Sequence, residues 1–448
     1  MLRPSLIVLT VLFCVVACRK EDTPDVTPTG PVTQAETNKW ILDSMRYFYL
    51  WNSYLPSSVD TTLSSTDYFA SLKYTDDRFS FLYNPNDNST YPKYMLYQYG
   101  IEFAIISGSN GPVGVIELVI PSSVAALNGI KRGDYFTAIN GTTITSSNAT
   151  ELTTAMLEGS SSTLTMESTG EEITLPAQSL GENPIYQQDT FLVNNKVVAY
   201  LFYNYFNDTY NTALQQVFQS FKTAGASELI LDLRYNPGGS AAAAALLNAM
   251  IATDITEQSI FAKYTGNSQL GSRNISYKSA LSVPESGSAI SFSTLSDKRL
   301  SLSRVFILSG AATASAAELT INSLKPYTQV IQIGETTYGK DKGAVIISDT
   351  RSPQRISWTL MPITYNLFNA AGTGGYTSGI TPDYSIDEMS SLPLTAIGDT
   401  NDPLIARAIA IINGNGRIST TNNSVKHYYN SPSLAAQKEI VKIVRSPL

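Results

Sequence analysis

The 448-residue sequence predicts a mixed α/β fold, because apolar runs of strand length alternate with helical segments in its second half. The clearest runs are residues 229–233 and 305–308, whose branched apolar side chains are typical of buried strands. An alanine-rich helical segment over residues 240–252 follows the first run, and a helix that stops at Pro326 follows the second. Together with a strand and a helix over residues 197–223, these runs give the strand–helix–strand order of an α/β core.

The small residues 310–317 join the second run to its helix and place Ser315 at the helix N-terminus. Unpaired backbone N–H groups and the helix dipole favour negative charge at such a position. A tetrahedral oxyanion could therefore be stabilised beside Ser315. Taken alone, Ser315 and Glu318 also fit the capping box S-x-x-E, in which the serine only satisfies a helix end.

Two further segments favour a catalytic role for Ser315 over a helix cap alone. An apolar strand over residues 330–333 leads into a glycine-bracketed loop that ends in Lys340, and this strand could return Lys340 to the end of the sheet where Ser315 lies. The run 229–233 ends in Asn-Pro-Gly-Gly, whose glycines Gly238 and Gly239 let backbone amides approach a ligand closely. Alone, the lysine could be a solvated charge and the glycines an ordinary tight turn, but the three segments together are far more specific.

The composition excludes several other classes of site. With 30 basic and 37 acidic residues the net charge is −7, which gives no basic footprint for nucleic acid. The two cysteines, Cys14 and Cys18, both lie in the first eighteen residues, so a disulfide framework or a thiol nucleophile in the body is excluded. The single histidine, His427, lies in a polar tail, and a Ser–His–Asp triad or a multi-histidine metal site would have to recruit it. Lysine remains as the plausible general base, and no cofactor or metal is expected.

These residues resemble the C-terminal processing (tail-specific) serine peptidases of family S41. The marks of that family are a D-L-R-x-N-P-G-G turn, a T-A-S-A-x-E elbow and a G-x-x-T-x-G-K loop, here at residues 232–239, 313–318 and 334–340. The resemblance covers most of the chain and implies a peptidase core of the ClpP/crotonase type over residues 181–415. It implies that Ser315 is the nucleophile and Lys340 its base. The backbone amides of Ala316 and of Gly238 or Gly239 are then expected to hold the oxyanion.

The sequence departs from the family pattern just after Lys340. Family members often carry a glutamine four residues after the lysine to orient it, and this position is Ala344 here. The sequence Asp341-Lys342-Gly343 replaces the usual G-K-G, so Lys342 is a rival for the catalytic role. The orienting partner of Lys340 therefore stays open.

The segments before the core predict two further domains. Residues 36–90 show helical periodicity and end in an aromatic D-R-F-S phrase, like the small amino-terminal region of the family, and are expected to be core rather than a cofactor site. Residues 91–180 read as a PDZ domain. Its candidate carboxylate-binding loop consists of Tyr99, Gly100, Ile101, Glu102 and Phe103. A glycine loop beside a strand edge suits a peptide C-terminus, which adds a strand to the sheet. The alternative is a structural β-module with a blocked groove.

The two ends of the chain carry other signals. Residues 1–18 have one positive charge and an apolar run too short to span a membrane, as in a secretory signal peptide. The run ends in Val-Val-Ala-Cys, which resembles a bacterial lipobox with Cys18 as the lipidated residue; the alternative is a generic signal peptide cleaved nearby. The charged start of the Pro- and Thr-rich tether 19–35 resembles the export tag of surface lipoproteins of Bacteroidetes. The tail, residues 416–448, shows no readable chemistry.

The sequence thus predicts a lipid-anchored serine endopeptidase of the cell envelope, on the periplasmic or surface face of the outer membrane. It is expected to cleave protein or peptide substrates, recognised through their C-termini by the PDZ domain, by a Ser–Lys acyl-enzyme mechanism. No nucleic-acid partner is expected, and the oligomeric state stays open. The alternative is a non-catalytic peptide- or ligand-binding envelope lipoprotein on the same scaffold. A glycan-binding lipoprotein is a third alternative, supported only by tyrosine content and the anchor.

Overall fold

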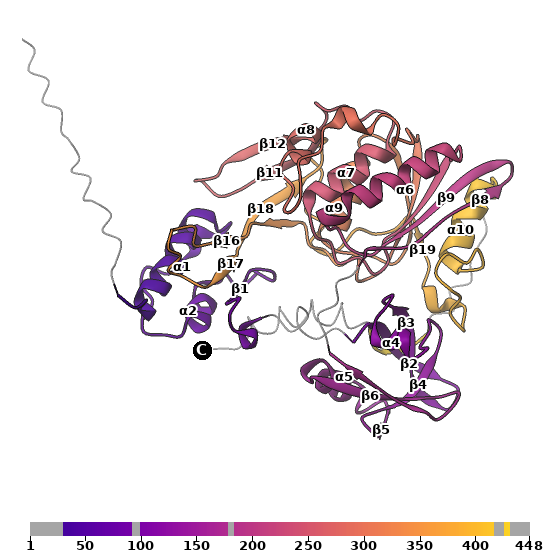
Figure 1. Ribbon diagram of the computed structural model, residues 1–448, viewed down its shortest axis with the longest axis horizontal. Helices are drawn as coiled ribbons and strands as arrows, with labels where there is room; N and C mark the ends of the chain where they lie inside the picture. Colours follow the sequence, from indigo (N-terminus) through magenta and orange to yellow (C-terminus); the bar gives the residue numbers. More distant parts are fainter. Residues whose placement is uncertain (1–29, 92–98, 178–182, 416–424, 431–448) are drawn as a thin grey trace, which may run out of the picture.

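The computed structural model describes residues 30–91, 99–177, 183–415 and 425–430, and it has a mixed α/β fold as predicted (Figure 1). Its centre is a six-stranded sheet in the order β19-β14-β13-β10-β9-β8. The first five of these strands run parallel, and only β8 pairs antiparallel with its neighbour. The strands are β8 (Ile185–Val193), β9 (Lys196–Tyr203), β10 (Glu228–Asp232), β13 (Arg304–Ser309), β14 (Gln329–Gly334) and β19 (Tyr384–Ser385).

Helices cover both faces of this central sheet (Figure 1). One face buries Leu229, Leu231 and Ile307 against α6 (Asn211–Thr223), α7 (Ala241–Ile251) and α9 (Ala316–Leu324). The other face buries Ile230 and Phe306 against α10 (Pro403–Ile412). Since successive side chains of a strand point to opposite faces, the continuous apolar runs seen in the sequence are those of strands buried on both sides.

A second sheet forms the region predicted as a PDZ domain, with its own core around Phe103 and Phe136. Its strand order is β20-β2-β3-β4-β6-β7, with β5 paired to β4. The edge strand β20 comes from the far end of the chain, from the tail in which the sequence showed no readable chemistry. The elements are β2 (Ile101–Gly108), β3 (Gly111–Val119), α4 (Val124–Leu127), β4 (Tyr135–Ile139), β5 (Thr142–Thr143), α5 (Ala149–Glu158), β6 (Ser161–Met166), β7 (Glu172–Pro176) and β20 (His427–Tyr429).

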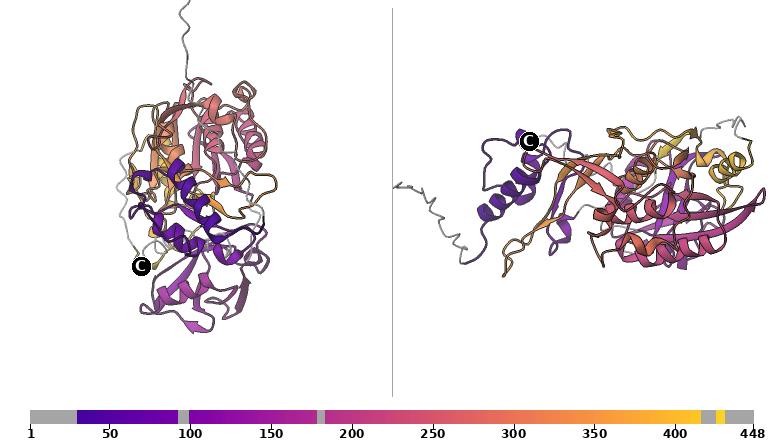
Figure 2. Two further views of the ribbon diagram at one scale, coloured as in Figure 1. Left: turned by 90° about the vertical axis from the view of Figure 1, so that its left-hand side faces the viewer. Right: turned by 90° about the horizontal axis from the view of Figure 1, so that it is seen from above.

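The helical amino-terminal region lies at one end of the molecule, beyond the central sheet (Figure 2). Residues much later in the chain complete it, because β1 pairs with β17 and Leu360 of β17 is part of its apolar core. A four-stranded sheet in the order β12-β11-β18-β15 is connected to it, because β18 follows β17 directly in the sequence. These elements are α1 (Gln34–Phe48), α2 (Ser65–Leu72), β1 (Phe81–Tyr83), β11 (Ile260–Thr265), β12 (Ser272–Ser276), α8 (Tyr277–Leu281), β15 (Lys342–Ala344), β16 (Ile347–Ser348), β17 (Thr359–Met361) and β18 (Ile363–Phe368).

Five short 3-10 helices complete the described elements: Asn52–Tyr54, Asn88–Thr90, Asp208–Tyr210, Phe292–Leu295 and Glu388–Ser390. Over the ranges that the structure describes, none of the helices combines the length and the hydrophobicity needed to span a membrane.

A buried ionic network joins the second sheet to the central one. Arg132, in the turn before β4, donates to Glu388 over 2.8 Å and to the hydroxyl of Tyr235 over 2.9 Å. Arg234 is 2% exposed and donates to the carboxylates of Asp402 over 2.8 Å and of Glu388 over 3.0 Å. Because Arg234 and Tyr235 begin the turn that contains Gly238 and Gly239, this network fixes that turn relative to the second sheet.

Candidate active site

The parallel pairing of β13 and β14 brings the segments that carry Ser315 and Lys340 together. The two strands end in register, with Ser309 opposite Gly334, so the segments that follow them start at the same edge of the sheet. Ser315 is the N-cap of α9, and Lys340 lies six residues after the end of β14. Open α/β sheets bind ligands at this carboxyl edge. The position expected for both residues from the sequence agrees with this arrangement.

Ser315 has an unusual backbone conformation, with a φ of 53° and a ψ of −113°. A positive φ is costly for a residue with a Cβ and persists only where surrounding contacts enforce it. Here the turn containing Gly238 packs closely against the serine, because a Cβ at Gly238 would lie 2.6 Å from the Cβ of Ser315. The N–H of Ala314 also donates to the carbonyl of Asn236 over 3.0 Å, so the two turns are held in direct contact.

Glu318 ties the serine turn to the lysine loop. Its fully buried carboxylate accepts the backbone N–H groups of Ser315 over 2.9 Å, Gly339 over 2.7 Å and Lys340 over 2.8 Å. It also accepts the hydroxyl of Thr337 over 2.5 Å. Burial raises the pKa of Glu318, and these four donors act in the opposite direction. Of the capping box expected from the sequence, the bond from the Ser315 N–H to Glu318 is present, whereas the Ser315 hydroxyl makes no side-chain cap bond. No sequence pattern indicated that the same carboxylate binds the loop of Lys340.

Lys340 lies in an apolar environment. Its Nζ is 5.4 Å from the centroid of the Phe79 ring, and within the described residues it has no hydrogen bond or carboxylate partner. Burial lowers the pKa of Lys340, while the charges of Glu318 and Asp77 act in the opposite direction. The ring of Phe79 therefore excludes water from one side of the amine.

Phe79 comes from the amino-terminal region, and local hydrogen bonds fix its position. Asp77 is buried and accepts the N–H groups of Phe79 over 3.0 Å and of Ser80 over 2.9 Å. The guanidinium of Arg78 lies over the rings of both Phe79 and Tyr338, 5.0 Å and 5.2 Å from their centroids. The aromatic stretch that the sequence predicted as core therefore also reaches the site, and its D-R-F-S phrase was the available signal.

The second lysine of the loop is in a different situation. Lys342 begins β15, and its Nζ forms an ion pair with Asp341 over 2.6 Å. The Lys342 amine is therefore already engaged by a neighbouring carboxylate, unlike the amine of Lys340. Ala344 has no side-chain group that could replace the missing glutamine, so an orienting partner for Lys340 is not found among the described residues.

The three backbone amides expected to form an oxyanion hole are not equivalent. The N–H of Gly238 donates to the side-chain oxygen of Asn236 over 2.8 Å. The N–H groups of Gly239 and Ala316 have no acceptor among the residues that the structure describes. Both glycines have positive φ, and a Cβ at Gly239 would lie 2.1 Å from the carbonyl oxygen of Phe206, so no larger residue fits there.

The predicted carboxylate-binding loop lies on the second sheet, at the start of β2. Gly100 has a φ of 77°, and its carbonyl accepts the N–H of Ile120 over 2.8 Å. The hydroxyl of Tyr99 donates to the carbonyl of Gly159 over 2.7 Å. Ile101 and Phe103 are buried, whereas Glu102 is half-buried.

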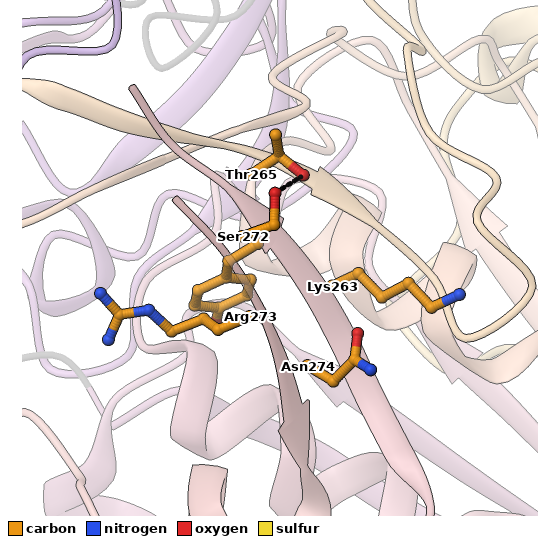
Figure 3. A pocket seen from close by; sticks show the side chains of 6 residues that line it. Lys263, Thr265, Ser272, Arg273 and Asn274 are labelled. Carbon is orange, nitrogen blue, oxygen red and sulfur yellow. Dashed lines mark hydrogen bonds between the residues drawn. The ribbon is translucent and has the colours of Figure 1, made fainter. Parts of the chain in front are cut away.

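The remaining candidate sites are separate from the site of Ser315 and Lys340. His427 lies on β20, with its Nε2 3.7 Å from a carboxylate oxygen of Asp387, and Cys18 lies outside the described residues. In the described part of the chain, no group of three or more His, Cys, Asp or Glu side chains is placed to hold a metal ion. A surface hollow of about 340 Å³ on the β11–β12 hairpin is lined by Lys263, Tyr264, Thr265, Ser272, Arg273 and Asn274 (Figure 3). It contains none of the residues discussed above.

The fold and the site define a PDZ-containing α/β protein in which a serine at a helix N-terminus and a half-buried lysine belong to segments that bind the same carboxylate. The chain belongs to peptidase family S41: the model of that family matches residues 197–386, and the model of the S41 N-terminal domain matches residues 36–81.

Two curated proteins are similar in sequence. Carboxyl-terminal-processing peptidase 1 of Arabidopsis thaliana chloroplasts is 26% identical over 275 residues, which are 59% of this chain and 51% of that protein. The carboxyl-terminal-processing protease of a Picosynechococcus species is 28% identical over 242 residues, which are 52% of each protein. The chain therefore matches about half the length of these relatives.

Solved structures extend the comparison of the fold. An S41 protease structure from Bacteroides fragilis has a TM-score of 0.66 at 26% identity and covers 87% of this chain and 99% of its own. The photosystem II D1 C-terminal processing protease has a TM-score of 0.50 at 18% identity, covering 84% and 97% respectively, and shows the fold alone. The predicted fold class, a ClpP/crotonase-like core with a PDZ domain, is confirmed.

The contacts of Glu318 yield a prediction about stability. Replacing Glu318 with Gln keeps the volume but places an amide N–H₂ group against buried N–H donors. Leaving such groups unsatisfied should lower the free energy of unfolding by about 1–3 kcal/mol, as measured by urea denaturation. Glu335→Gln is the matched control, because among the described residues this exposed glutamate on the same loop accepts a single N–H, from Ala311 over 3.3 Å. Equal stability of the two variants would contradict the assigned role of Glu318.

Proposed function

We propose that this protein is a serine endopeptidase in which Ser315 is the nucleophile and Lys340 the general base. One observation carries the proposal: the backbone N–H groups of Ser315 and Lys340 bind the same carboxylate, that of Glu318, while the Lys340 amine forms no ion pair with any described residue. A free lysine has a pKa of about 10.4, so well under about 1% is neutral at pH 7. Burial beside Phe79 lowers the pKa of Lys340 and increases the neutral fraction.

The chemical steps follow from the positions of these groups. The neutral Lys340 amine takes the proton of the Ser315 hydroxyl as the serine oxygen attacks the scissile carbonyl carbon. The N–H groups of Gly239 and Ala316 receive the oxyanion, since the Gly238 N–H is already bound to Asn236. The Lys340 ammonium then protonates the leaving amine, and water hydrolyses the acyl-enzyme by the same route. The structure has no hydrogen bond between Ser315 and Lys340, and such contacts often tighten only when substrate binds.

The substrates are proposed to be proteins or peptides recognised through their C-termini by the PDZ domain. Two similar proteins are named carboxyl-terminal-processing enzymes, which supports this class of substrate. The Gly100 loop at the start of β2 supports binding of a terminal carboxylate by backbone amides.

The dyad is tested by cleavage of an unfolded protein with the form lacking residues 1–18. Ser315→Ala and Lys340→Ala should each lower the rate by about a thousandfold or more, because the nucleophile or its base is lost. Lys340→Arg should not restore activity, since arginine stays protonated. Lys342→Ala is the matched control and should keep most of the activity, because Lys342 is already paired with Asp341. A folded Lys340→Ala protein with full activity would refute the assignment. An unaltered protein that binds peptides without cleaving them would favour the non-catalytic alternative.

The role of Phe79 predicts a change in the pH profile. Activity should rise with pH as Lys340 loses its proton, and the lowered pKa of Lys340 places this rise below the range of an ordinary lysine. Phe79→Ala admits water to the amine, raises the pKa of Lys340 and should move the midpoint of kcat/KM to higher pH. Phe81→Ala, on β1, should leave the midpoint unchanged, because the Phe81 ring contacts Tyr83 instead. An unchanged midpoint in a less active Phe79→Ala protein would indicate a role in substrate binding only.

We also propose that the protein is anchored in the cell envelope through a lipid on Cys18, at the outer membrane. The support is the short apolar run that ends in Val-Val-Ala-Cys, followed by a Pro- and Thr-rich tether. In the native host, Cys18→Ala should move the protein from the membrane to the soluble envelope fraction, as measured by fractionation and immunoblotting. Cys14→Ala is the matched control and should stay with the membrane. A Cys18→Ala protein that remains membrane-bound would disprove the anchor.

A further inference from the structure

Strand β20 occupies the edge of β2 next to the predicted carboxylate-binding loop. It pairs antiparallel with β2, with Tyr429 opposite Ile105 and His427 opposite Ile106. The N–H of Ser107 also donates to the carbonyl of Lys426 over 2.9 Å. Since β2 starts at the loop and runs away from it, the antiparallel segment runs towards the loop. This is the direction that a peptide takes when its C-terminus enters a PDZ groove.

Side chains of the same segment pack on the second sheet between β2 and α5. The ring of Tyr429 stacks on Phe103 with the centroids 5.6 Å apart and an angle of 25° between the planes. Tyr428 and Tyr429 both pack on the apolar core of the second sheet, and β20 also contacts α5. The segment thus lies on a strand edge beside a helix, and its aromatic side chains replace those that an external peptide would bring.

The segment also reaches groups outside the groove. Val425 packs on the cluster that contains Ile106, Met389 and Leu394, and His427 lies 3.7 Å from the carboxylate of Asp387. Met389, Leu394 and Asp387 belong to the stretch between β19 and α10, which carries Glu388 of the buried ionic network. The segment therefore binds to the second sheet and to the stretch that connects that sheet to the turn of Gly238.

The contact with β2 is partial. Paired residues of β20 reach only Ile105 and Ile106, and within the described residues the outer edge of β2 from Ile101 to Ala104 has no strand partner. A peptide whose carboxylate binds at the Gly100 loop and that extends past Ala104 needs the same edge as β20. The two cannot be bound there together.

We propose that residues 425–430 are an internal ligand of the PDZ groove, which a substrate C-terminus must displace, and that the groove prefers an aromatic side chain against Phe103. This inference rests on the proposed function, because it takes the substrates to be protein C-termini. A tethered ligand acts at an effective concentration in the millimolar range, so even a three-residue strand competes well with dilute substrate. The inference names the chemistry of the preferred substrates: extended C-terminal segments with a tyrosine-like residue a few positions before the end.

The test measures binding of a fluorescent peptide with the sequence of residues 425–430 followed by three serines and a free carboxyl terminus, which carries the peptide from the register of Tyr429 opposite Ile105 to the Gly100 loop. All proteins carry Ser315→Ala, so that cleavage does not interfere. Tyr429→Ser removes the ring that stacks on Phe103 and should bind the peptide at least about tenfold more tightly than the protein with an unaltered tail. Deletion of residues 416–448 should give the same gain. Lys426→Ser is the matched control on the same segment, and its affinity should be unchanged because this exposed side chain contacts Tyr428 of its own segment, 4.7 Å from the ring centroid, and leaves the Tyr429 ring in place.

The outcomes separate the inference from the proposed function. Equal affinity of the Tyr429→Ser and unaltered proteins would overturn the inference, as would a lower melting temperature of Tyr429→Ser without a gain in affinity, which would mark β20 as a permanent strand. If the deletion variant fails to fold, Tyr429→Ser decides alone. A peptide with serine in place of its second tyrosine should bind at least about tenfold more weakly, and equal binding would refute the aromatic preference. Equal binding of free-acid and amidated peptides to Tyr429→Ser would instead contradict C-terminal recognition, and cleavage by the Ser315 form tests catalysis independently.

Discussion

The four hydrogen bonds accepted by the buried carboxylate of Glu318 are the interaction on which the site depends. A carboxylate withdrawn from water is strongly unfavourable unless donors replace its solvation. Here three backbone N–H groups and one hydroxyl do so, and they belong to the serine turn and to the lysine loop. These two segments must therefore meet, and their meeting fixes Ser315 in its positive-φ conformation next to the loop of Lys340.

Three separate regions of the chain meet around Glu318 and the two segments that it joins. The amino-terminal region supplies Phe79, which covers the Lys340 amine and lowers its pKa. The central sheet supplies the two turns that contain Ser315 and Gly239. The second sheet reaches the Gly239 turn through Arg132, which shares Glu388 and Tyr235 with the residues that begin that turn. A change in the position of the second sheet would thus act on Arg234 and Tyr235, which lie five and four residues before Gly239.

The difference between the two lysines shows why sequence reasoning left the base partly open. Lys340 and Lys342 are two residues apart in one loop, and local sequence gives both the same chemistry. The fold places Asp341 beside Lys342 and an aromatic ring beside Lys340. Burial beside that ring lowers the pKa of Lys340, and Phe79 lies more than 250 residues away in the chain. Similarly, the sequence offered Gly238 and Gly239 as equal oxyanion donors, and the side chain of Asn236 engages one of them.

The sequence by itself determined the α/β class, the strands that precede Ser315 and Lys340, the Asn-Pro-Gly-Gly turn and the PDZ region. These features depend on residues within about ten positions of one another, since side-chain periodicity, glycine turns and helix caps act over that range. The tertiary structure alone decided that Glu318 joins the serine turn to the lysine loop, that Phe79 covers Lys340 and that β20 pairs with β2. Each of these contacts joins segments distant in the chain or different loops at one sheet edge. Their energy comes from desolvation and hydrogen bonds that exist only once the sheets are packed, so no local pattern encodes them.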